Sequence, residues 1–310
     1  MMKLPTNLPT YATGLKQVLT ALRAKPPVCG INPEDFEWKT SYAIQQDSNN
    51  LISLKELGYS LKDYEDSILA MTSFKGPCKI LTNAGEILLR EICLNLETYA
   101  RSSNFIISKR TRAADSHSKF IYDMIRDRNF LLNLSKIAQA PLVPHLIRNA
   151  ATQVNYYYPE DDDCQDKKIA KWHVDGMNFV FNILLSDVTE FEGGDFIYFK
   201  GPVSQFSLRP NDDLVMTSPS KHIGDTIYVH GSKVFHAVTP VTKGKRVSII
   251  LSMYCPYLPE MDSNTFWHVA GDDGVPATLK SWGAFQTAKK RSHAAYSAIG
   301  CAPITWEDLA

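Results

Sequence analysis

The sequence predicts an α+β protein in which helices come first, one β core follows, and a helical tail ends the chain. Three observations favour this class. The first 140 residues contain segments with apolar residues at helical spacing. After Pro141 the segments are short, rich in Val, Ile, Tyr and Phe, and punctuated by Gly, Pro, Asp and Asn, as in an antiparallel sandwich or barrel. Beyond Pro256 the chain becomes irregular and then helical, which completes the α+β order.

Each expected element follows from these patterns. The expected helices are Tyr11–Ala24, Tyr59–Met71, Asn83–Tyr99, Ser118–Ala138 with a break near Arg126-Asp127, and Leu279–Ala298. The expected strands are Thr152–Tyr158, Asn178–Leu185, Asp195–Phe199, Asp213–Met216, Thr226–Val229 and Arg246–Tyr254. We therefore expect a helical region over 1–140 that supports the core, a β core over 141–258 and an extension over 259–310, all in one integrated catalytic domain.

Composition narrows the possible partners. The 310 residues include 33 basic and 33 acidic side chains, so the formal net charge is zero with His neutral. This balance lacks the basic bias of proteins that bind nucleic acid or acidic lipid, and we expect neither as a partner. The six cysteines are scattered without a CxxC pair, which indicates reduced thiols. With no secretion signal and no apolar run of roughly 18 residues, the expectation is a soluble, intracellular and cytoplasmic protein.

The first candidate for chemistry is the triplet His173-Val174-Asp175. Residues two apart on a strand point to the same side, so the imidazole and the carboxylate can meet. Alone, such a pair is more often a hydrogen-bonded surface pair. However, His236 follows a turn and an apolar strand, Gly224–Val229. Two histidines and one carboxylate fill one face of an octahedral metal and leave three positions open, which suits non-haem Fe(II) that binds an organic chelate and O₂.

A second pair, Arg246 and Ser248, follows His236 at the distance of one hairpin. These residues are also two apart on an expected strand, so both can face one cavity. A guanidinium donates two parallel hydrogen bonds to a carboxylate, and a hydroxyl adds a third, as the distal carboxylate of 2-oxoglutarate requires. The alternative is a surface cation beside Lys243 and Lys245. The apolar strand that Arg246 opens argues against it, because a buried Arg needs an anion.

These motifs form an ordered set. The sequences HVDG, FEGGDF and GDTIYVHGSKVFHAVTPVTKGKRVS, within Thr152–Pro256, resemble the Fe(II)/2-oxoglutarate dioxygenase superfamily, and within it the prolyl and lysyl hydroxylases most. A looser similarity links Ser118–Ala138 to enzymes that oxidise free amino acids. The resemblance implies a double-stranded β-helix (jelly roll) core. It also implies iron held by His173, Asp175 and His236, and 2-oxoglutarate held by Arg246 and Ser248, with use of O₂ and release of succinate and CO₂.

Further residues gain roles from the resemblance. Asn182 matches a polar position near the iron-bound end of 2-oxoglutarate, although a hydrogen-bonded core Asn is an equal alternative. Tyr156 and Tyr158 share one face of their strand, where the family commonly has a Tyr that contacts 2-oxoglutarate. Three consecutive tyrosines leave the register open, and core packing is the alternative for at least one. The Glu192-Gly193-Gly194 turn is read as a tight turn. Asp175 disfavours halogenation, since related halogenases have a small residue there.

The expected function is oxygenation of an aliphatic C–H bond in a small amino-acid-derived substrate, by hydroxylation or by oxidative cyclisation or desaturation. We expect the substrate to bear a carboxylate, for which Arg110, Arg112 and Arg148 are candidate partners, although solvated surface charge is the commoner role for each. Two alternatives stay open. One is a prolyl or lysyl hydroxylase that acts on protein side chains, and the other is a non-catalytic jelly roll that binds a ligand.

Overall fold

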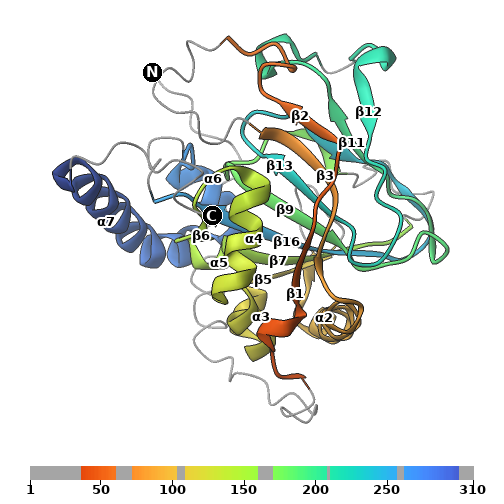
Figure 1. Ribbon diagram of the computed structural model, residues 1–310, viewed down its shortest axis with the longest axis horizontal. Helices are drawn as coiled ribbons and strands as arrows, with labels where there is room; N and C mark the ends of the chain where they lie inside the picture. Colours follow the sequence, from red (N-terminus) through yellow and green to blue (C-terminus); the bar gives the residue numbers. More distant parts are fainter. Residues whose placement is uncertain are drawn as a thin grey trace.

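The fold combines antiparallel sheets with helices (Figure 1). The computed structural model describes residues 36–60, 72–102, 109–159, 170–207, 210–256 and 262–299. The predicted helix Tyr11–Ala24 and residues 61–71 of the next one lie outside these ranges, and the first two residues of that second helix, Tyr59 and Ser60, are not helical. No helix in the described ranges is both long and apolar enough to cross a membrane.

A ten-stranded antiparallel sheet forms the centre, in the order β1-β3-β13-β9-β16-β7-β5-β4, with β2 paired to β3 and β6 to β16. Its strands are β1 Ala43–Gln46, β2 Leu51–Ser53, β3 Thr72–Leu81, β4 Arg101–Ser102, β5 Lys109–Arg112, β6 Val143–Pro144, β7 Thr152–Tyr157, β9 Phe179–Leu184, β13 Thr226–His230 and β16 Arg246–Tyr254. Strands β1 to β5 precede residue 140, so the expectation of a helical first region was wrong in this respect. Pairing of β3 with β13, β1 and β2 overrides the Gly76-Pro77 pair, which disfavours a strand.

A four-stranded sheet, in the order β12-β11-β14-β8, faces the large one, and β10 pairs with β15 beside it. The bounds are β8 Ala170–His173, β10 Phe191–Gly193, β11 Phe196–Phe199, β12 Val215–Thr217, β14 His236–Val238 and β15 Val241–Gly244. One buried cluster joins the two sheets, with Phe74 and Val229 from the large sheet and Tyr198 and Val238 from the small one. The space between the sheets therefore has an apolar lining.

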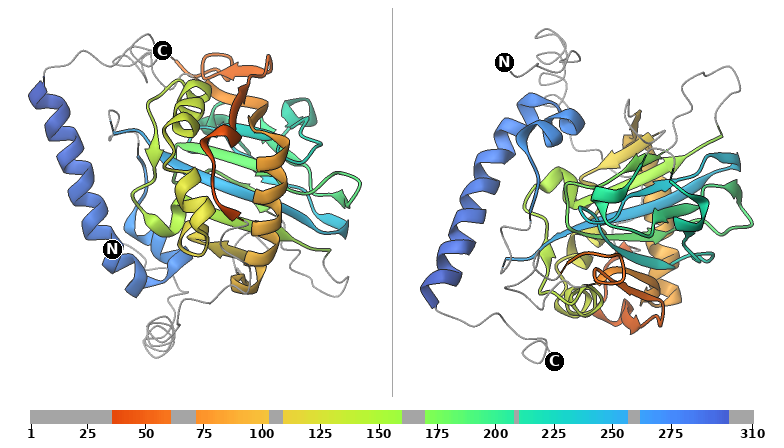
Figure 2. Two further views of the ribbon diagram at one scale, coloured as in Figure 1. Left: turned by 60° about the horizontal axis from the view of Figure 1, so that its bottom comes forward. Right: turned by 90° about the horizontal axis from the view of Figure 1, so that it is seen from above.

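Helices cover the other face of the large sheet (Figure 2). They are α2 Asn83–Asn95, α3 Lys119–Met124, α4 Arg128–Ala138 and α5 Arg148–Ala151, with 3₁₀ helices at Thr40–Tyr42, Leu96–Tyr99, Ala114–Ser116, Val203–Gln205 and Asp212–Leu214. The expected break near Arg126-Asp127 is confirmed: Asp127 caps α4 by accepting a hydrogen bond from the Phe130 amide at 2.9 Å. These helices bury the apolar face of the sheet and leave its other face to the site.

The C-terminal segment contains α6, Phe266–Asp273, which was not predicted, and α7, Val275–Ile299, which confirms the expected tail helix (Figure 1). A buried pair attaches this segment to the core. The Ile147 amide donates to Nδ1 of His145, so Nε2 of His145 donates to Asp262, at 2.7 Å. Both side chains are at most 4% exposed. The pair therefore fixes the chain just before α6.

Replacing His145 with alanine is expected to destabilise the protein by about 2 kcal/mol, because the buried carboxylate of Asp262 loses the hydrogen bond from Nε2 and keeps only those from Asn264. Burial alone would raise the pKa of Asp262, but the hydrogen bonds from His145 and Asn264 hold it below its ordinary 3.8. A lowered native pKa gives stability that is present above 3.8 and is lost as the pH falls through the native pKa. Urea unfolding of the native protein and of His145→Ala should show a difference in unfolding free energy that becomes smaller as the pH falls toward 3. His222→Ala, on an exposed side chain, is the control, and an equal loss in both variants would contradict this role.

Candidate metal centre and adjoining pocket

Three side chains meet where the small sheet faces the large one. His173 ends β8, and His236 begins β14 directly opposite it. Asp175 follows two residues after His173, beyond the strand, so the expectation that the strand continues through Asp175 was wrong. Its carboxylate lies between the two imidazoles, 3.5 Å from Nε2 of His173 and 3.4 Å from Nε2 of His236. All three ligand atoms lie within 4.8 Å of one another, close enough to hold one metal ion.

Backbone groups fix the orientation of each of these side chains. Nδ1 of His173 contacts the Lys171 carbonyl at 2.7 Å, and Nδ1 of His236 contacts the Val234 carbonyl at 2.9 Å. A carbonyl only accepts, so each Nδ1 carries a proton, and Nε2, which faces Asp175, is then the nitrogen that would bind a metal when the ring is neutral. This is the tautomer that binds a metal through Nε2, and a hydrogen bond at the other nitrogen is the usual support of such a ligand.

Asp175 itself is held by the turn after β13. Its amide donates to the Gly231 carbonyl at 2.9 Å. A Cβ at Gly231 would lie 2.8 Å from the Asp175 Cβ and 2.2 Å from the Met177 carbonyl oxygen, so only glycine fits this approach. Burial would raise the pKa of Asp175, but the adjacent His236 and His173 hold it below its usual range. The carboxylate therefore stays ionised.

The two histidines differ in their titration. Burial lowers the pKa of His236 to about 4, and the neighbouring His173 adds to this shift. Burial also acts to lower the pKa of His173, but the hydrogen bond and charge of Asp175 raise it overall. Phe196 stacks on the His236 ring, with centroids 5.4 Å apart, which keeps water from that side of the imidazole.

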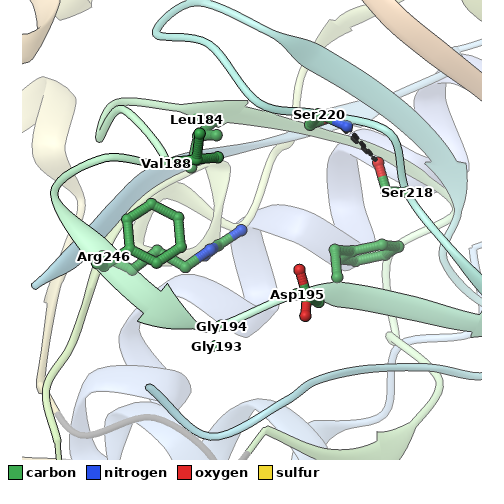
Figure 3. A pocket seen from close by; sticks show the side chains of 10 residues that line it. Leu184, Val188, Gly193, Gly194, Asp195, Ser218, Ser220 and Arg246 are labelled. Atoms are coloured by element: carbon green, nitrogen blue, oxygen red, sulfur yellow. Dashed lines mark hydrogen bonds between the residues drawn. The ribbon is translucent and has the colours of Figure 1, made fainter. Parts of the chain in front are cut away.

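Arg246 lies at the start of β16 beside a cavity of about 190 Å³. Its side chain extends into this cavity toward Asp195 (Figure 3). The cavity is lined by Leu184, Val188, Phe191, Gly193, Gly194, Asp195, Phe196, Ser218, Ser220 and Arg246. Arg246 is only 4% exposed, and Nη1 donates to Ser248 Oγ at 3.3 Å. Within the described ranges it makes no ion pair, and burial lowers its pKa. The charge of Asp195, which lines the same cavity, acts on this pKa in the opposite direction, and the guanidinium keeps further donors for a carboxylate ligand.

The prediction of a tight turn at Glu192-Gly193-Gly194 was wrong: Glu192 and Gly193 belong to β10, whose register with β15 shifts between these two residues, and Gly194 follows the strand. Gly193 (+73°) and Gly194 (+68°) both have positive φ, which glycine favours. Gly194 also has a role that the sequence did not reveal. A Cβ at Gly194 would lie 2.9 Å from Cδ of Arg246, so the absence of a side chain there leaves room for the guanidinium.

Gly194→Ala is therefore expected to displace Arg246 and to weaken 2-oxoglutarate binding about tenfold, equivalent to about 1.4 kcal/mol. Isothermal titration of the metal-loaded protein measures this change. Gly283→Ala in α7 is the matched control, since no atom lies within 4 Å of a Cβ there. The control should bind 2-oxoglutarate normally and be slightly more stable. Equal affinity for 2-oxoglutarate in both variants would mean that Gly194 does not shape the pocket around Arg246.

In β7 the tyrosine that faces the space between the sheets is Tyr157, whereas the sequence analysis expected Tyr156 or Tyr158 to contact the cosubstrate. Tyr156 and Tyr158 do share a face, but it is the face under the helices: Tyr156 donates to the Cys93 carbonyl at 2.5 Å, and Tyr158 hydrogen-bonds to Glu97. Tyr157 belongs to the cluster between the sheets, and its ring lies 5.2 Å from the Arg246 guanidinium carbon. Burial raises the pKa of Tyr157, and the charges of Arg246 and Asp175 both act on it. Tyr157 therefore lies beside Arg246 and within reach of the charge of Asp175.

The remaining candidates are placed as follows. Asn182 is 8% exposed, and its strand neighbours Phe181 and Ile183 pack under the helices, so its side chain faces the space between the sheets. Ser248 is fully buried on that same side, next to Arg246. Arg110 and Arg112 are not solvated surface charges; both pair with carboxylates of α6. Arg148 begins α5.

Comparisons with known proteins give structural neighbours only. No family model and no curated protein matches the chain. A 2OG-Fe(II) oxygenase family oxidoreductase from Burkholderia pseudomallei is similar at 18% identity over 44% of this chain and 55% of its own, with a TM-score of 0.32. The non-heme alpha ketoglutarate dependent epimerase SnoN from nogalamycin biosynthesis has 15% identity, coverage of 66% and 83%, and a TM-score of 0.44. HygX from Streptomyces hygroscopicus, with nickel, 2-oxoglutarate and hygromycin B bound, has 11% identity, coverage of 63% and 86%, and a TM-score of 0.44. Such low scores carry no functional argument, so the function is inferred from the site.

Proposed function

We propose that this chain is an Fe(II)- and 2-oxoglutarate-dependent oxygenase. In this proposal it activates an aliphatic C–H bond of a small amino-acid-derived substrate, by hydroxylation or by oxidative cyclisation or desaturation, and releases succinate and CO₂. The observation that carries the proposal is the buried Arg246, which has no ion-pair partner among the described residues and lies one tyrosine away from a His-Asp-His group. A metal group and a dicarboxylate pocket side by side are what this chemistry needs.

The donor set fits ferrous iron. His173, His236 and Asp175 offer two imidazole nitrogens and one carboxylate oxygen, a set of intermediate hardness that leaves coordination positions for other ligands. When bound, iron would supply the activation of O₂ and the chelation of 2-oxoglutarate. The protein contributes the orientation of the ligands through the Lys171 and Val234 carbonyls.

The other residues bind and orient the cosubstrate. Arg246 and Ser248 hold the distal carboxylate of 2-oxoglutarate, with Gly194 leaving space for the guanidinium. Tyr157 takes the role that the resemblance assigned to its neighbours: burial raises its pKa, so its hydroxyl stays protonated and can donate to the cosubstrate. Asn182 faces the same space and can hydrogen-bond the end of the cosubstrate nearer the metal. We further propose that the two facing sheets form a double-stranded β-helix.

Two measurements test this function. Anaerobic addition of Fe(II) and 2-oxoglutarate should produce a visible charge-transfer band, and native mass spectrometry should show a mass gain for both. A colourless mixture without mass gain would leave the non-catalytic binding protein as the better interpretation. Succinate release should then be measured with free amino acids, their N-alkylated derivatives, and Pro- or Lys-containing peptides. Stimulation by peptides alone would favour a protein hydroxylase.

A further inference from the structure

Arg110 and Arg112 lie on the same face of the large sheet as Tyr157. In the pairing of β5 with β7, Arg110 lies opposite Asn155 and Arg112 opposite Gln153. Residues opposite each other on antiparallel strands share a face, so both arginines lie on the face that carries Tyr157. Side-chain hydrogen bonds run along this face: Gln153 donates to Asn155 at 2.6 Å, and Asn155 to the Tyr157 hydroxyl at 3.5 Å. The arginines therefore belong to the site side of the sheet.

The two guanidinium groups are used very differently. Arg112 donates through Nε and Nη2 to both oxygens of Asp273, at 2.9 and 2.8 Å, and through Nη1 to Gln153 at 2.9 Å. Its donors are thus engaged on every side. Arg110 makes one hydrogen bond within the described residues, from Nη2 to Asp272 at 2.6 Å. A guanidinium has five N–H donors, so Arg110 keeps the capacity to bind a further carboxylate through two parallel bonds.

The Arg110–Asp272 pair lies next to the metal group. The chain before α6 contacts the residue after Asp175: Ser263 donates to the Gly176 carbonyl at 3.4 Å. One turn before Asp272 on α6, Nδ1 of His268 would lie 3.0 Å from a Cβ at Gly176. Helix α6 therefore spans the distance from the metal group to the arginines.

We propose that Arg110 binds the carboxylate of the substrate, and that Asp272 occupies this position in the substrate-free protein. The proposal rests on the oxygenase function above and specifies its substrate class as a small carboxylic acid such as an amino acid. When the substrate carboxylate replaces that of Asp272, the buried Arg110 stays paired. The substrate carboxylate can accept two hydrogen bonds from Arg110, whereas Asp272 accepts one. Arg112 also contacts Asp272, at 3.4 Å, and its two-bond pair with Asp273 keeps α6 attached during the exchange.

Equilibrium binding tests this assignment without turnover. The probes are the twenty L-amino acids, and the matched controls are the corresponding amino-acid amides, which lack the carboxylate. Binding to the Fe(II)- and 2-oxoglutarate-loaded protein under anaerobic conditions is measured by calorimetry, and hydrogen exchange of residues 266–273 reports on α6. At least one acid should bind at least tenfold more tightly than its amide and should increase exchange in α6, because Asp272 is released.

Variants separate recognition from structural support. Arg110→Gln should remove the preference for acid over amide, while Asp272→Asn should tighten acid binding several-fold, because the competing carboxylate is gone. Arg112→Gln should lower the melting temperature but keep the preference. Equal binding of acids and amides by the native protein, or an unchanged preference in Arg110→Gln, would overturn the proposal. The charge-transfer band is read in the same samples, so a missing band, which refutes the oxygenase function, is distinct from a missing acid preference.

Discussion

Replacing His173 with alanine is expected to reduce iron affinity by more than about 100-fold and to abolish succinate release. Loss of a residue that merely supports a metal ligand typically costs about 10- to 100-fold, so loss of a ligand should cost more. The remaining His236 and Asp175 offer two donors, and the backbone contact of His173 with Lys171 disappears with the ring. Iron binding is measured by anaerobic titration with a colorimetric chelator as competitor, and turnover by succinate formation.

His222→Ala is the matched control for this change. His222 has a 74% exposed side chain and lies beside Asp187, away from the three ligands. It should bind iron and turn over like the native protein, with the same melting temperature. Full turnover in His173→Ala would mean that the metal ligands are assigned wrongly, whereas loss of activity in both variants would indicate a general effect of histidine removal.

Arg246→Gln is expected to raise the Kd for 2-oxoglutarate by about 100-fold, equivalent to about 3 kcal/mol, while iron binding stays intact. The guanidinium is buried, with Ser248, the Tyr157 ring and the Asp195 carboxylate around it, and it forms no ion pair among the described residues, so its donors are available to the distal carboxylate. Pyruvate, which keeps the α-keto acid but lacks the distal carboxylate, should bind the native protein weakly and the variant equally weakly. This equality would show that the lost affinity belongs to the distal carboxylate.

Lys245→Gln provides the control, because it removes a cation one residue away. Lys245 points to the opposite face, where its Nζ lies 3.0 Å from Glu97. Its affinity for 2-oxoglutarate should match that of the native protein. If both variants lose the same affinity, the effect comes from overall charge; if neither loses any, the cosubstrate pocket lies elsewhere.

The sequence predicted the β core well and the first region poorly, for a physical reason. Strands such as Arg246–Tyr254 have long apolar runs that indicate a buried strand by themselves. Strand β3 contains Lys75, Gly76 and Pro77, which weaken a strand in isolation, and it forms because β13 and β1 pair with it from distant positions. Pairing partners far apart along the chain are not visible in local patterns.

The sequence likewise predicted some residues of the site and missed others. The order of His173, Asp175 and His236 predicted that they would meet, although Asp175 reaches the group from beyond the end of β8 and not from the strand. The tyrosine register was missed because every residue of β7 is buried, so no polar and apolar alternation distinguishes its faces. The carboxylates that pair with Arg110 and Arg112 come from α6, about 160 residues further along the chain, and no local signal links them.

The position of His173 has a consequence for the integrity of the sheet. Among the strands that the structure describes, β8 is an edge strand, joined to the small sheet through β14 alone. A metal bound to His173 and His236 would link opposite residues of these strands and would lock their register, since a slip of one residue turns His173 to the other face. Without the metal, β8 is held by its backbone pairing and by side-chain contacts such as that of Trp172 with Phe206, and loss of β8 would leave β14 as an open edge to which another chain can pair. Chelation should therefore promote association between molecules, visible as increased light scattering that added metal reverses.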